Sequence, residues 1–203
     1  FVLLRPSYKY VLADKHERNS FLSRFKHKFS RLRKNDLLMF LDETSVKQHP
    51  NIQPKWSLKG SKEVVGTFGN HAKINVFGAI SHSLGKVFHM KSRKLNSDIF
   101  IKFLEHLMIL NPTKYLVLVI DNAPWHKSKK VINLLGNVSK KLEVLWLPAY
   151  SPDFNPIEHL WRFMKEIVSN FFFPKISEMI NDIADFFNNL YQKKQKIMTL
   201  CSP

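Results

Sequence analysis

Residues 115–126 read YLVLVIDNAPWH, and this stretch carries the clearest structural signal in the chain. Its first half is an apolar run that predicts a strand buried on both faces, and Asp121 follows at the carboxyl end of that strand. Residues 37–42 read LLMFLD and repeat the pattern, with Asp42 in the same position. In open α/β sheets, ligands bind in the crevice beyond the carboxyl ends of the strands. If the two strands are neighbours, Asp42 and Asp121 converge there.

The flanking segments predict further strands and helices. An antiparallel pair joined by a hairpin at 83–85 comes first, and a β-α-β-α-α order follows. Asn111-Pro112 stops one helix, and Pro124 suits the first turn of another. The sequence therefore predicts an α/β fold with a mixed sheet and helices on both faces. The expected strands are 37–41, 73–80, 86–90, 115–120 and 142–147, and the expected helices are 98–110, 127–136, 156–170 and 178–193.

The charge balance favours a polyanionic partner. The chain has 32 Lys and Arg against 16 Asp and Glu, a formal charge of +16 at pH 7, which favours DNA or RNA. A basic protein from a lysine-rich source, or one that binds anionic membranes, is the alternative. The hydrophobic content of 44% is enough for one compact domain with a small appendage.

Several other classes of protein are excluded. Phe1–Leu4 is too short an apolar run for a signal peptide, and Arg5 follows it. The single cysteine, Cys201, excludes an intramolecular disulfide and a cysteine zinc cluster. The sequence has no glycine-rich phosphate loop, no His-Glu-x-x-His helix and no Gly-x-Ser-x-Gly elbow. Because the chain begins without Met, we expect an N-terminal part to be missing.

Two carboxylates brought together repel each other, and a bound divalent cation removes the conflict. Oxygen ligands suit Mg²⁺ or Mn²⁺, so Asp42 and Asp121 are candidate metal ligands. The alternative is that each aspartate caps the turn or helix that follows it, which is the commoner role for a single aspartate. Glu158 has a similar alternative. Asn155-Pro156-Ile157-Glu158 reads as a capping box at a helix start, which explains this glutamate without a metal.

Three neighbours of these acids are weaker candidates. Asp153 is a rival third acid, although Ser151-Pro152-Asp153 is typical of a turn. Glu43 follows Asp42 and should point to the opposite side of the strand. His126 could lie near the same crevice, but a surface or helix-start histidine is the commoner interpretation.

Residues 6–34 differ from the rest of the chain. Phe21, Phe25, Phe29 and Leu32 fall on one helical face, and basic residues crowd the remainder. The segment is either a helix that contacts DNA or a solvated helix that packs one stripe on the core, with a membrane-surface helix as a third alternative.

Four stretches together resemble the mariner-like superfamily of DDE transposases, especially the branch carried by bacterial insertion sequences. LDET at 41–44 resembles the first catalytic motif of that branch, and KWSLKG at 55–60 its Trp-x-x-x-Gly element. VIDNAPWH at 119–126 resembles the second motif, and LPAYSPDFNPIEHLW at 147–161 the third, which is the most specific stretch. Glu158 follows Asp121 by 37 positions, a spacing similar to that of the family. The resemblance covers about residues 36–190.

The resemblance implies a ribonuclease H-like fold in which Asp42, Asp121 and Glu158 are catalytic and hold the metal, with two Mg²⁺ or Mn²⁺ ions expected. It implies metal-dependent DNA cleavage and strand transfer at transposon ends, double-stranded DNA of the ends and of the target as partner, a homodimer in the active complex, and no membrane. Residues 1–35 are then a linker and helix that follow a missing helix-turn-helix region, 36–195 the catalytic domain, and 196–203 a tail.

The remaining expectations concern DNA contacts, compartment and rival functions. The protein would act in the cytoplasm with the bacterial nucleoid, or in the nucleus if its source is eukaryotic. One rival is a ribonuclease H-like nuclease without strand transfer, and another is an inactive DNA-binding remnant of a transposase. The candidate DNA contacts are Arg24, Lys28, Arg31, Trp56, Lys59 and His126.

Overall fold

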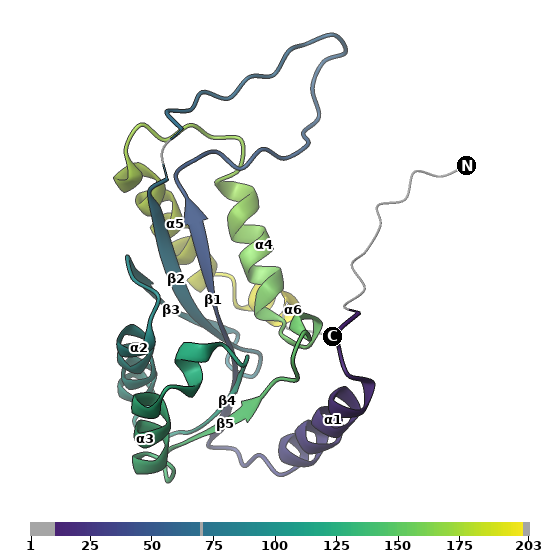
Figure 1. The fold of residues 1–203 in the computed structure, drawn as a ribbon, viewed down its shortest axis with the longest axis vertical. Coiled ribbons are helices and arrows are strands. Elements are labelled where there is room, and N and C mark those ends of the chain that lie inside the picture. The colour runs from purple at the N-terminus through teal and green to yellow at the C-terminus, as the bar shows by residue number, and fades with distance from the viewer. Residues whose placement is uncertain (1–10, 70, 201–203) are drawn as a thin grey trace, which may run out of the picture.

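The computed structural model describes residues 11–69 and 71–200, so Cys201 and the apolar run Phe1–Leu4 lie outside the described residues. Five strands form one sheet in the order β3-β2-β1-β4-β5, and helices cover both of its faces (Figure 1). The predicted mixed α/β sheet is therefore confirmed. The strands are β1 (Asp36–Lys47), β2 (Lys73–Ser81), β3 (Lys86–Ser92), β4 (Tyr115–Ile120) and β5 (Leu142–Trp146).

The pairing of the strands explains why the sheet is mixed. β1, β2 and β3 pair antiparallel, and the predicted β2–β3 hairpin turns at Gly85, whose φ of 56° suits glycine. β4 and β5 are reached through helical crossovers, and they pair parallel to β1 and to each other. β1 is thus the central strand, with β2 on one edge and β4 on the other.

β1 is longer than the sequence predicted. We expected a strand over 37–41 that ends at Asp42, but β1 continues to Lys47 because its full second half pairs with β2. The parallel pairing with β4 stops earlier, at Phe40 opposite Val119. Extending that register places Asp42 level with Asp121, just where β4 ends. Asp42 therefore lies within a strand, on an edge that β4 has left open.

One face of the sheet is covered by α2 (Ser97–Leu110) and α3 (Lys129–Asn137), with the short 3-10 helix η1 (Pro124–Lys127) before α3. The apolar stripe of α2 is buried against odd-numbered residues of β1, as the alternation of a strand requires. The core on this face includes Leu37, Met39, Leu41, Phe77, Phe100, Phe103 and Leu104.

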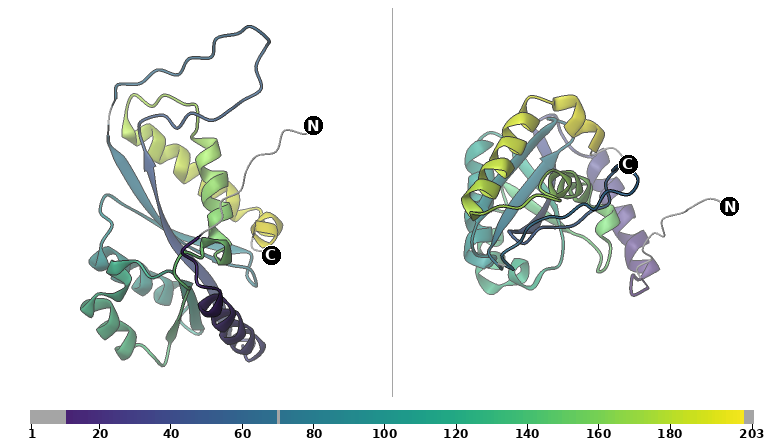
Figure 2. Two further views of the ribbon diagram at one scale, coloured as in Figure 1. Left: turned by 45° about the vertical axis from the view of Figure 1, so that its right-hand side comes forward. Right: turned by 90° about the horizontal axis from the view of Figure 1, so that it is seen from above.

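The other face is covered by α4 (Ile157–Ile167), α5 (Ile176–Tyr191) and α6 (Lys194–Leu200), and Figure 2 shows these helices across the sheet from α2 and α3. α4 crosses β1 and β2 directly. The core here includes Val46, Val76, Ile80, Leu160, Trp161, Met164 and Phe187. α6 runs across the predicted boundary at 195 and buries Ile197 in this core, and the proposed division of the chain stays a prediction.

α1 (Lys15–Ser30) packs one stripe on the core, as one of the three interpretations of this segment proposed. Phe21 is buried, and its ring lies 5.7 Å from the ring of Phe154 between centroids. Phe29 is 59% exposed and Leu32 lies beyond the helix, so the stripe is shorter than predicted. α1 therefore docks on the loop that leads into α4.

None of the helices in the described ranges, 11–69 and 71–200, combines the length and the apolar character that crossing a bilayer requires.

Candidate active site

Asp42, Asp121 and Glu158 line one open pocket of about 390 Å³. They come from three different elements, the middle of β1, the residue after β4 and the first turn of α4. The opposite wall is the segment 147–152 that follows β5. The structure thus brings together the three acids that the sequence singled out, although they lie up to 116 positions apart in the chain.

Asp42 is held by a side chain from α4. The indole Nε1–H of Trp161 donates to Oδ2 of Asp42 at 2.9 Å. The pKa of Asp42 is raised to about 8, chiefly by burial and further by the charges of Glu158 and Glu43, while hydrogen bonds from the Glu43 backbone and from Trp161 oppose the rise. The ionised form of this half-buried carboxylate is therefore disfavoured, and a nearby positive charge would stabilise it.

Gly78 makes the Trp161 contact possible. It is the β2 partner of Asp42, and a Cβ at this position would stand 2.4 Å from Cη2 and 2.8 Å from Cζ2 of the Trp161 ring. Real Cβ atoms are essentially never found so close to a neighbour. The indole lies over the glycine, and any side chain here would push α4 away from the sheet.

Asp121 is held by a buried histidine. His126 Nδ1 lies 2.8 Å from Oδ1 of Asp121, and its Nε2 lies 2.8 Å from Oε1 of Glu43. Burial alone would lower the pKa of His126, but the hydrogen bonds to Asp121 and Glu43 outweigh it and raise the pKa to about 9. The ring is then an imidazolium at neutral pH that donates to both carboxylates.

The surface interpretation of His126 is wrong, because the side chain is fully buried under the ring of Phe100, 4.2 Å away between centroids. A buried ring cannot contact DNA, so His126 leaves the set of candidate DNA contacts. Glu43 does point to the opposite side of β1 from Asp42, as predicted. Its partnership with His126 was missed, and the only local signal for it was the strand alternation.

Glu158 stands in the first turn of α4 and lines the pocket. Burial raises its pKa, and the charge of Asp121 adds to the rise, whereas Lys165 opposes it. The capping-box interpretation is wrong in both halves, because the N-cap of α4 is Pro156 and the backbone N–H of Glu158 donates to the backbone carbonyl of Asn155. The backbone N–H of Asn155 donates to Pro152 O at 2.8 Å, which removes the donor that Glu158 would need.

Asp153, the rival third acid, is occupied elsewhere. Arg18 of α1 holds both of its carboxylate oxygens, at 2.9 Å and 2.6 Å. The side chain does not line the pocket of the three acids. Asp153 therefore ties α1 to the loop before α4 and does not join the site.

The donor set fits a hard divalent cation. All three pocket acids offer oxygen ligands, and the charges of Glu158 on Asp42 and of Asp121 on Glu158 raise the pKa values of those acids, which a cation would relieve. As the side chains are placed in residues 11–69 and 71–200, no three His, Cys, Asp or Glu form a ready-made cage.

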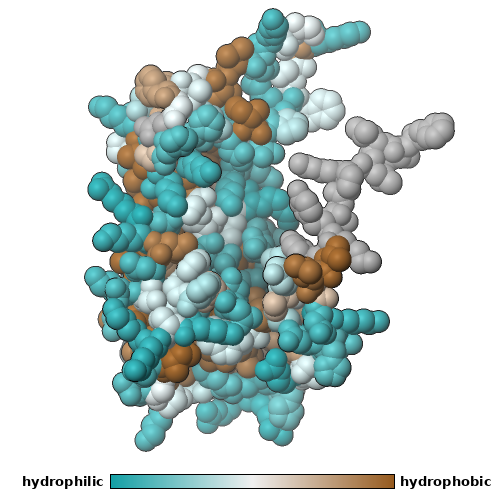
Figure 3. Space-filling model, viewed as in Figure 1, coloured by the Kyte–Doolittle hydropathy of each residue, from teal (hydrophilic) through white to brown (hydrophobic). Residues whose placement is uncertain are grey.

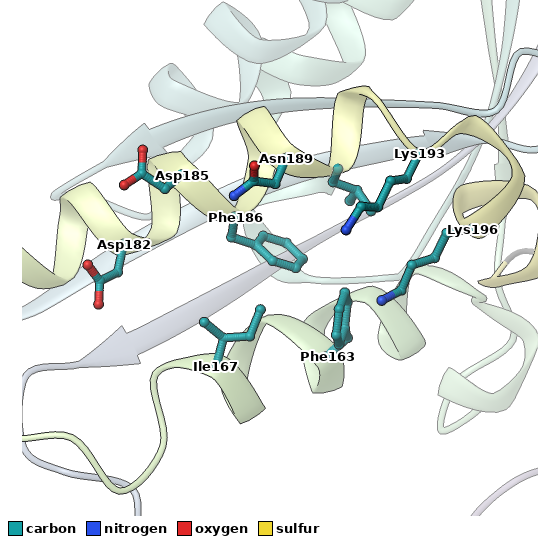
Figure 4. A pocket seen from close by; sticks show the side chains of 9 residues that line it. Phe163, Ile167, Asp182, Asp185, Phe186, Asn189, Lys193 and Lys196 are labelled. Atoms are coloured by element: carbon teal, nitrogen blue, oxygen red, sulfur yellow. The ribbon is translucent and has the colours of Figure 1, made fainter.

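A groove of about 470 Å³ between α4 and α5 is larger than this pocket but carries different chemistry (Figure 4). Phe163 and Phe186 form its floor, with Asp182 and Asp185 at one end and Lys193 and Lys196 at the other. It contains none of the three clustered acids. The pocket of Asp42, Asp121 and Glu158 is therefore the candidate active site.

The other candidate DNA contacts lie in different settings. Trp56 is fully exposed and Lys59 is also exposed, both on the long connection between β1 and β2 that extends beyond the sheet in Figure 1. Arg24 and Arg31 are exposed on α1 and at its end. Lys28 pairs with Glu143, so its charge is already compensated.

The chain is similar to several known proteins. A family model described as DDE superfamily endonuclease matches residues 37–180. The chain is 29% identical over 133 residues to an uncharacterised 39 kDa protein of insertion element IS630 from Shigella sonnei, covering 65% of the chain and 38% of that protein. It is also 29% identical over 133 residues to the Tc3 transposable element transposase of Caenorhabditis elegans, covering 61% of the chain and 39% of that protein. The chain thus spans about two fifths of the length of these relatives.

Solved structures show the same fold. The Mos1 mariner paired-end complex with Mg aligns with a TM-score of 0.72 at 16% identity, over 98% of the chain and 64% of the Mos1 chain. The catalytic domain of Mos1 mariner transposase aligns with a TM-score of 0.59 at 16% identity, over 97% of both chains. The likeness is one of fold, and it confirms the expected ribonuclease H-like architecture.

Proposed function

The chain belongs to the DDE superfamily endonuclease family, and from this we propose that it is the catalytic core of a transposase that cuts DNA and joins the cut end to a target. The family model, the insertion-element relative and the mariner-type fold confirm the resemblance that the sequence motifs carried. The observation that carries the proposal is the convergence of Asp42, Asp121 and Glu158 in one pocket.

The metal sites are part of the proposal. Asp42 and Asp121 would hold two Mg²⁺ or Mn²⁺ ions, and Glu158 would complete the coordination. Mos1 complexes with Mg and with Mn have been solved, which supports the same choice of ion here. Bound divalent ions supply a water of lowered pKa and stabilise the charge on the leaving 3′ oxygen.

The protein groups around the acids keep them in place for this role. Trp161 fixes the orientation of the Asp42 carboxylate, and the His126 imidazolium fixes that of Asp121. Both contacts come from buried or nearly buried rings, so the carboxylates are oriented before any metal binds.

Cleavage and joining would use the same pocket. In cleavage, water attacks the phosphorus, a new P–O bond forms, and the bond to the 3′ oxygen breaks and leaves a 3′-OH. In strand transfer, that 3′-OH takes the place of water, attacks a target phosphodiester and releases the target's own 3′-OH. The two steps differ only in the nucleophile, so one set of acids serves both.

The partners and compartment follow from charge and from the relatives. A formal charge of +16 and a largely hydrophilic face, as Figure 3 shows for the view of Figure 1, suit contact with the DNA backbone. Mos1 has been solved as a paired-end complex with a left transposon end, which supports transposon ends as the substrate and a dimer as the active form. The protein would act where the DNA is, at the nucleoid or in the nucleus.

The decisive experiment measures Mg²⁺-dependent cleavage of a labelled duplex. Asp42→Asn, Asp121→Asn and Glu158→Gln should each reduce cleavage by at least about a hundredfold, the lower range for loss of one transition-state contact. Glu166→Gln, an exposed acid on the same helix α4, is the matched control and should cleave normally. Normal cleavage by Glu158→Gln would remove that residue from the site.

A second measurement addresses metal binding without relying on activity. Mg²⁺ should raise the melting temperature of the chain, because it binds the folded site. Asp42→Asn should raise the melting temperature without metal, since it removes a carboxylate that burial disfavours, and should abolish the Mg²⁺ effect. An equal Mg²⁺ effect in the chain and the variant would contradict the assignment of Asp42.

The two rival functions give different products. A nuclease without strand transfer would cleave the duplex but would not join a pre-cut 3′-OH end to a second DNA. An inactive remnant would bind DNA whether or not Mg²⁺ is present and would give no product. The cleavage assay and the strand-transfer assay together therefore separate all three.

A further inference from the structure

A second groove, of about 480 Å³, adjoins the candidate active site. Its walls are α1 on one side and the segments after β4 and β5 on the other. Four residues line both this groove and the active-site pocket, so the two spaces share one wall. The shared residues are Asn122, Leu147, Pro148 and Ala149.

The shared wall is fastened to the sheet. The side-chain amide of Asn122 donates to the carbonyl of Leu147, and the backbone N–H of Leu147 donates to Ile120 O at 2.8 Å. The ends of β4 and β5 are thereby joined beside Asp121. A ligand that crosses this wall passes directly from the groove to the three acids.

The charges of the two spaces are opposite. The active-site pocket carries three acids, whereas the groove carries Arg24 and Lys127, with Glu17 as its acid. Within the described part of the chain, neither Arg24 nor Lys127 pairs with a carboxylate. Lys127 Nζ lies 5.2 Å from the centroid of the Trp146 ring, which also lines the groove. Both cations are exposed and available to an anion.

α1 forms a fixed wall for this groove. Arg18 binds Asp153 through two hydrogen bonds and Ser151 through a third at 2.9 Å, and its guanidinium lies 4.0 Å from the ring centroid of Phe154. His16, Ser20 and Arg24 follow at intervals of four and line the groove together. The helix therefore presents one polar face to the groove while its apolar stripe is buried.

We propose that this groove between α1 and residues 146–149 binds the phosphodiester backbone of the DNA strand that leads to the scissile phosphate, with Arg24 and Lys127 as the phosphate contacts. The inference rests on the proposed function and adds the path of the substrate to it. An anionic backbone lies beside the cations, and the shared wall delivers the next phosphate to the acids. α1 is then part of the substrate site as well as a support for the fold.

The test compares cations inside the groove with cations outside it. Arg24→Ala and Lys127→Ala remove groove charges, while Lys26→Ala and Lys129→Ala each remove one positive charge from an exposed position on α1 or α3 that does not line the groove. Binding of a labelled duplex is measured without divalent metal over a range of salt concentrations. If DNA is attracted only by the overall positive charge, all four variants should lose affinity equally. If the groove holds phosphates, only the two groove variants should lose affinity.

Each groove variant should bind the duplex on the order of tenfold more weakly at about 0.1 M salt. The plot of the logarithm of the association constant against the logarithm of the salt concentration should also become shallower, by about 0.9 in slope. The two control variants should bind within about twofold of the parent chain and keep its slope, since a diffuse surface charge forms no direct contact. Arg24→Lys and Lys127→Arg should restore most of the affinity. Equal losses in all four alanine variants, or no loss in any, would overturn the proposal.

Cleavage then separates this inference from the proposed function. With Mg²⁺ and low DNA, the groove variants should lose cleavage in proportion to binding, whereas the two control variants should cleave at the parent rate. If only the groove variants lose DNA affinity but the parent chain does not cleave DNA, the proposed DNA-binding groove stands and the proposed transposase function is rejected. If the parent chain cleaves DNA but all four variants have the same DNA affinity, the proposed transposase function stands and the proposed groove is rejected.

Discussion

Trp161 of α4 donates its indole N–H to the carboxylate of Asp42 on β1 at 2.9 Å, across a patch of sheet where Gly78 has no side chain. Glu158 stands one turn earlier on the same helix. α4 therefore delivers one acid to the pocket and orients a second. The position of this helix over β1 and β2 sets the geometry of two of the three acids.

Replacing Trp161 with Phe should separate orientation from packing. The phenyl ring fills most of the buried space, so the loss of stability should come chiefly from the missing hydrogen bond and amount to about 1–3 kcal/mol, the cost of leaving a buried polar group without its partner. The indole donor lowers the pKa of Asp42, so its loss should raise that pKa and make protons compete harder with Mg²⁺. The Mg²⁺ concentration for half-maximal cleavage should rise at pH 7 and approach that of the parent at pH 9. A deficit that is the same at both pH values would indicate a packing effect alone.

Gly78→Ala should displace α4. The new Cβ would meet the Trp161 ring at 2.4 Å and 2.8 Å, and overpacking of this kind costs about 1–3 kcal/mol. Cleavage should fall as well, because α4 carries Glu158. Thermal denaturation and cleavage rates check both expectations.

Gly136→Ala is the matched control for this substitution. No heavy atom lies within 4 Å of a Cβ at Gly136, which sits in α3, so alanine should stabilise by up to about 1 kcal/mol. The double variant Gly78→Ala with Trp161→Phe should recover part of the stability, since the phenyl ring lacks the two clashing atoms. Additive losses in the double variant would mean that the clash is not the cause.

The sequence predicted the elements well because their signals are local. Apolar runs predicted β4 and β5, and helix stop signals placed the end of α2 at Leu110, where the helix ends. The three acids could also be predicted, but their grouping came from the family resemblance, since each one alone had a capping alternative. The local pattern of apolar residues therefore predicts the fold class, whereas the site depends on contacts between residues far apart in the chain.

What could not be predicted depends on pairs far apart in the chain. His126 and Glu43 are 83 positions apart, and Trp161 and Asp42 are 119 apart. A histidine after a strand looks like a surface residue until the sheet places a carboxylate beside each of its nitrogens. The extension of β1 beyond Asp42 was missed for the same reason, because its second half is held by β2 and carries polar residues.

His126→Gln tests the buried ion pairs through pH. The folded pKa of His126, about 9, is above the ordinary value of 6.5, so the folded state binds more protons than the unfolded state between these values. The stabilisation is therefore complete below pH 6.5 and is lost as the pH rises through 9. The variant should be less stable by about 3–5 kcal/mol near pH 6, as for a broken buried ion pair.

The difference between His126→Gln and the parent chain should then shrink as the pH rises through 9. Denaturant unfolding at pH 6, 8 and 10 measures it. His27→Gln, a substitution of an exposed histidine on α1, is the control and should change stability little at any of these values. A constant difference between the His126 variant and the parent would show that the imidazolium is not the stabilising species.

Asp153→Asn tests which acid of the third motif acts in the pocket. Asp153 is about half exposed and paired with Arg18, so losing its charge should cost no more than about 1 kcal/mol. Metal-dependent cleavage and the Mg²⁺ effect on melting should both persist, in contrast to Glu158→Gln. Arg18→Ala completes the comparison, because it removes the same ion pair and leaves the Asp153 carboxylate in place. If Asp153 only ties α1 to its loop, both variants should cleave near-normally, and Arg18→Ala should lose more stability because it also removes the hydrogen bond to Ser151 and the contact with the Phe154 ring. A loss of cleavage and of the Mg²⁺ effect in Asp153→Asn alone would instead identify Asp153 as a metal ligand, because only that variant removes the carboxylate.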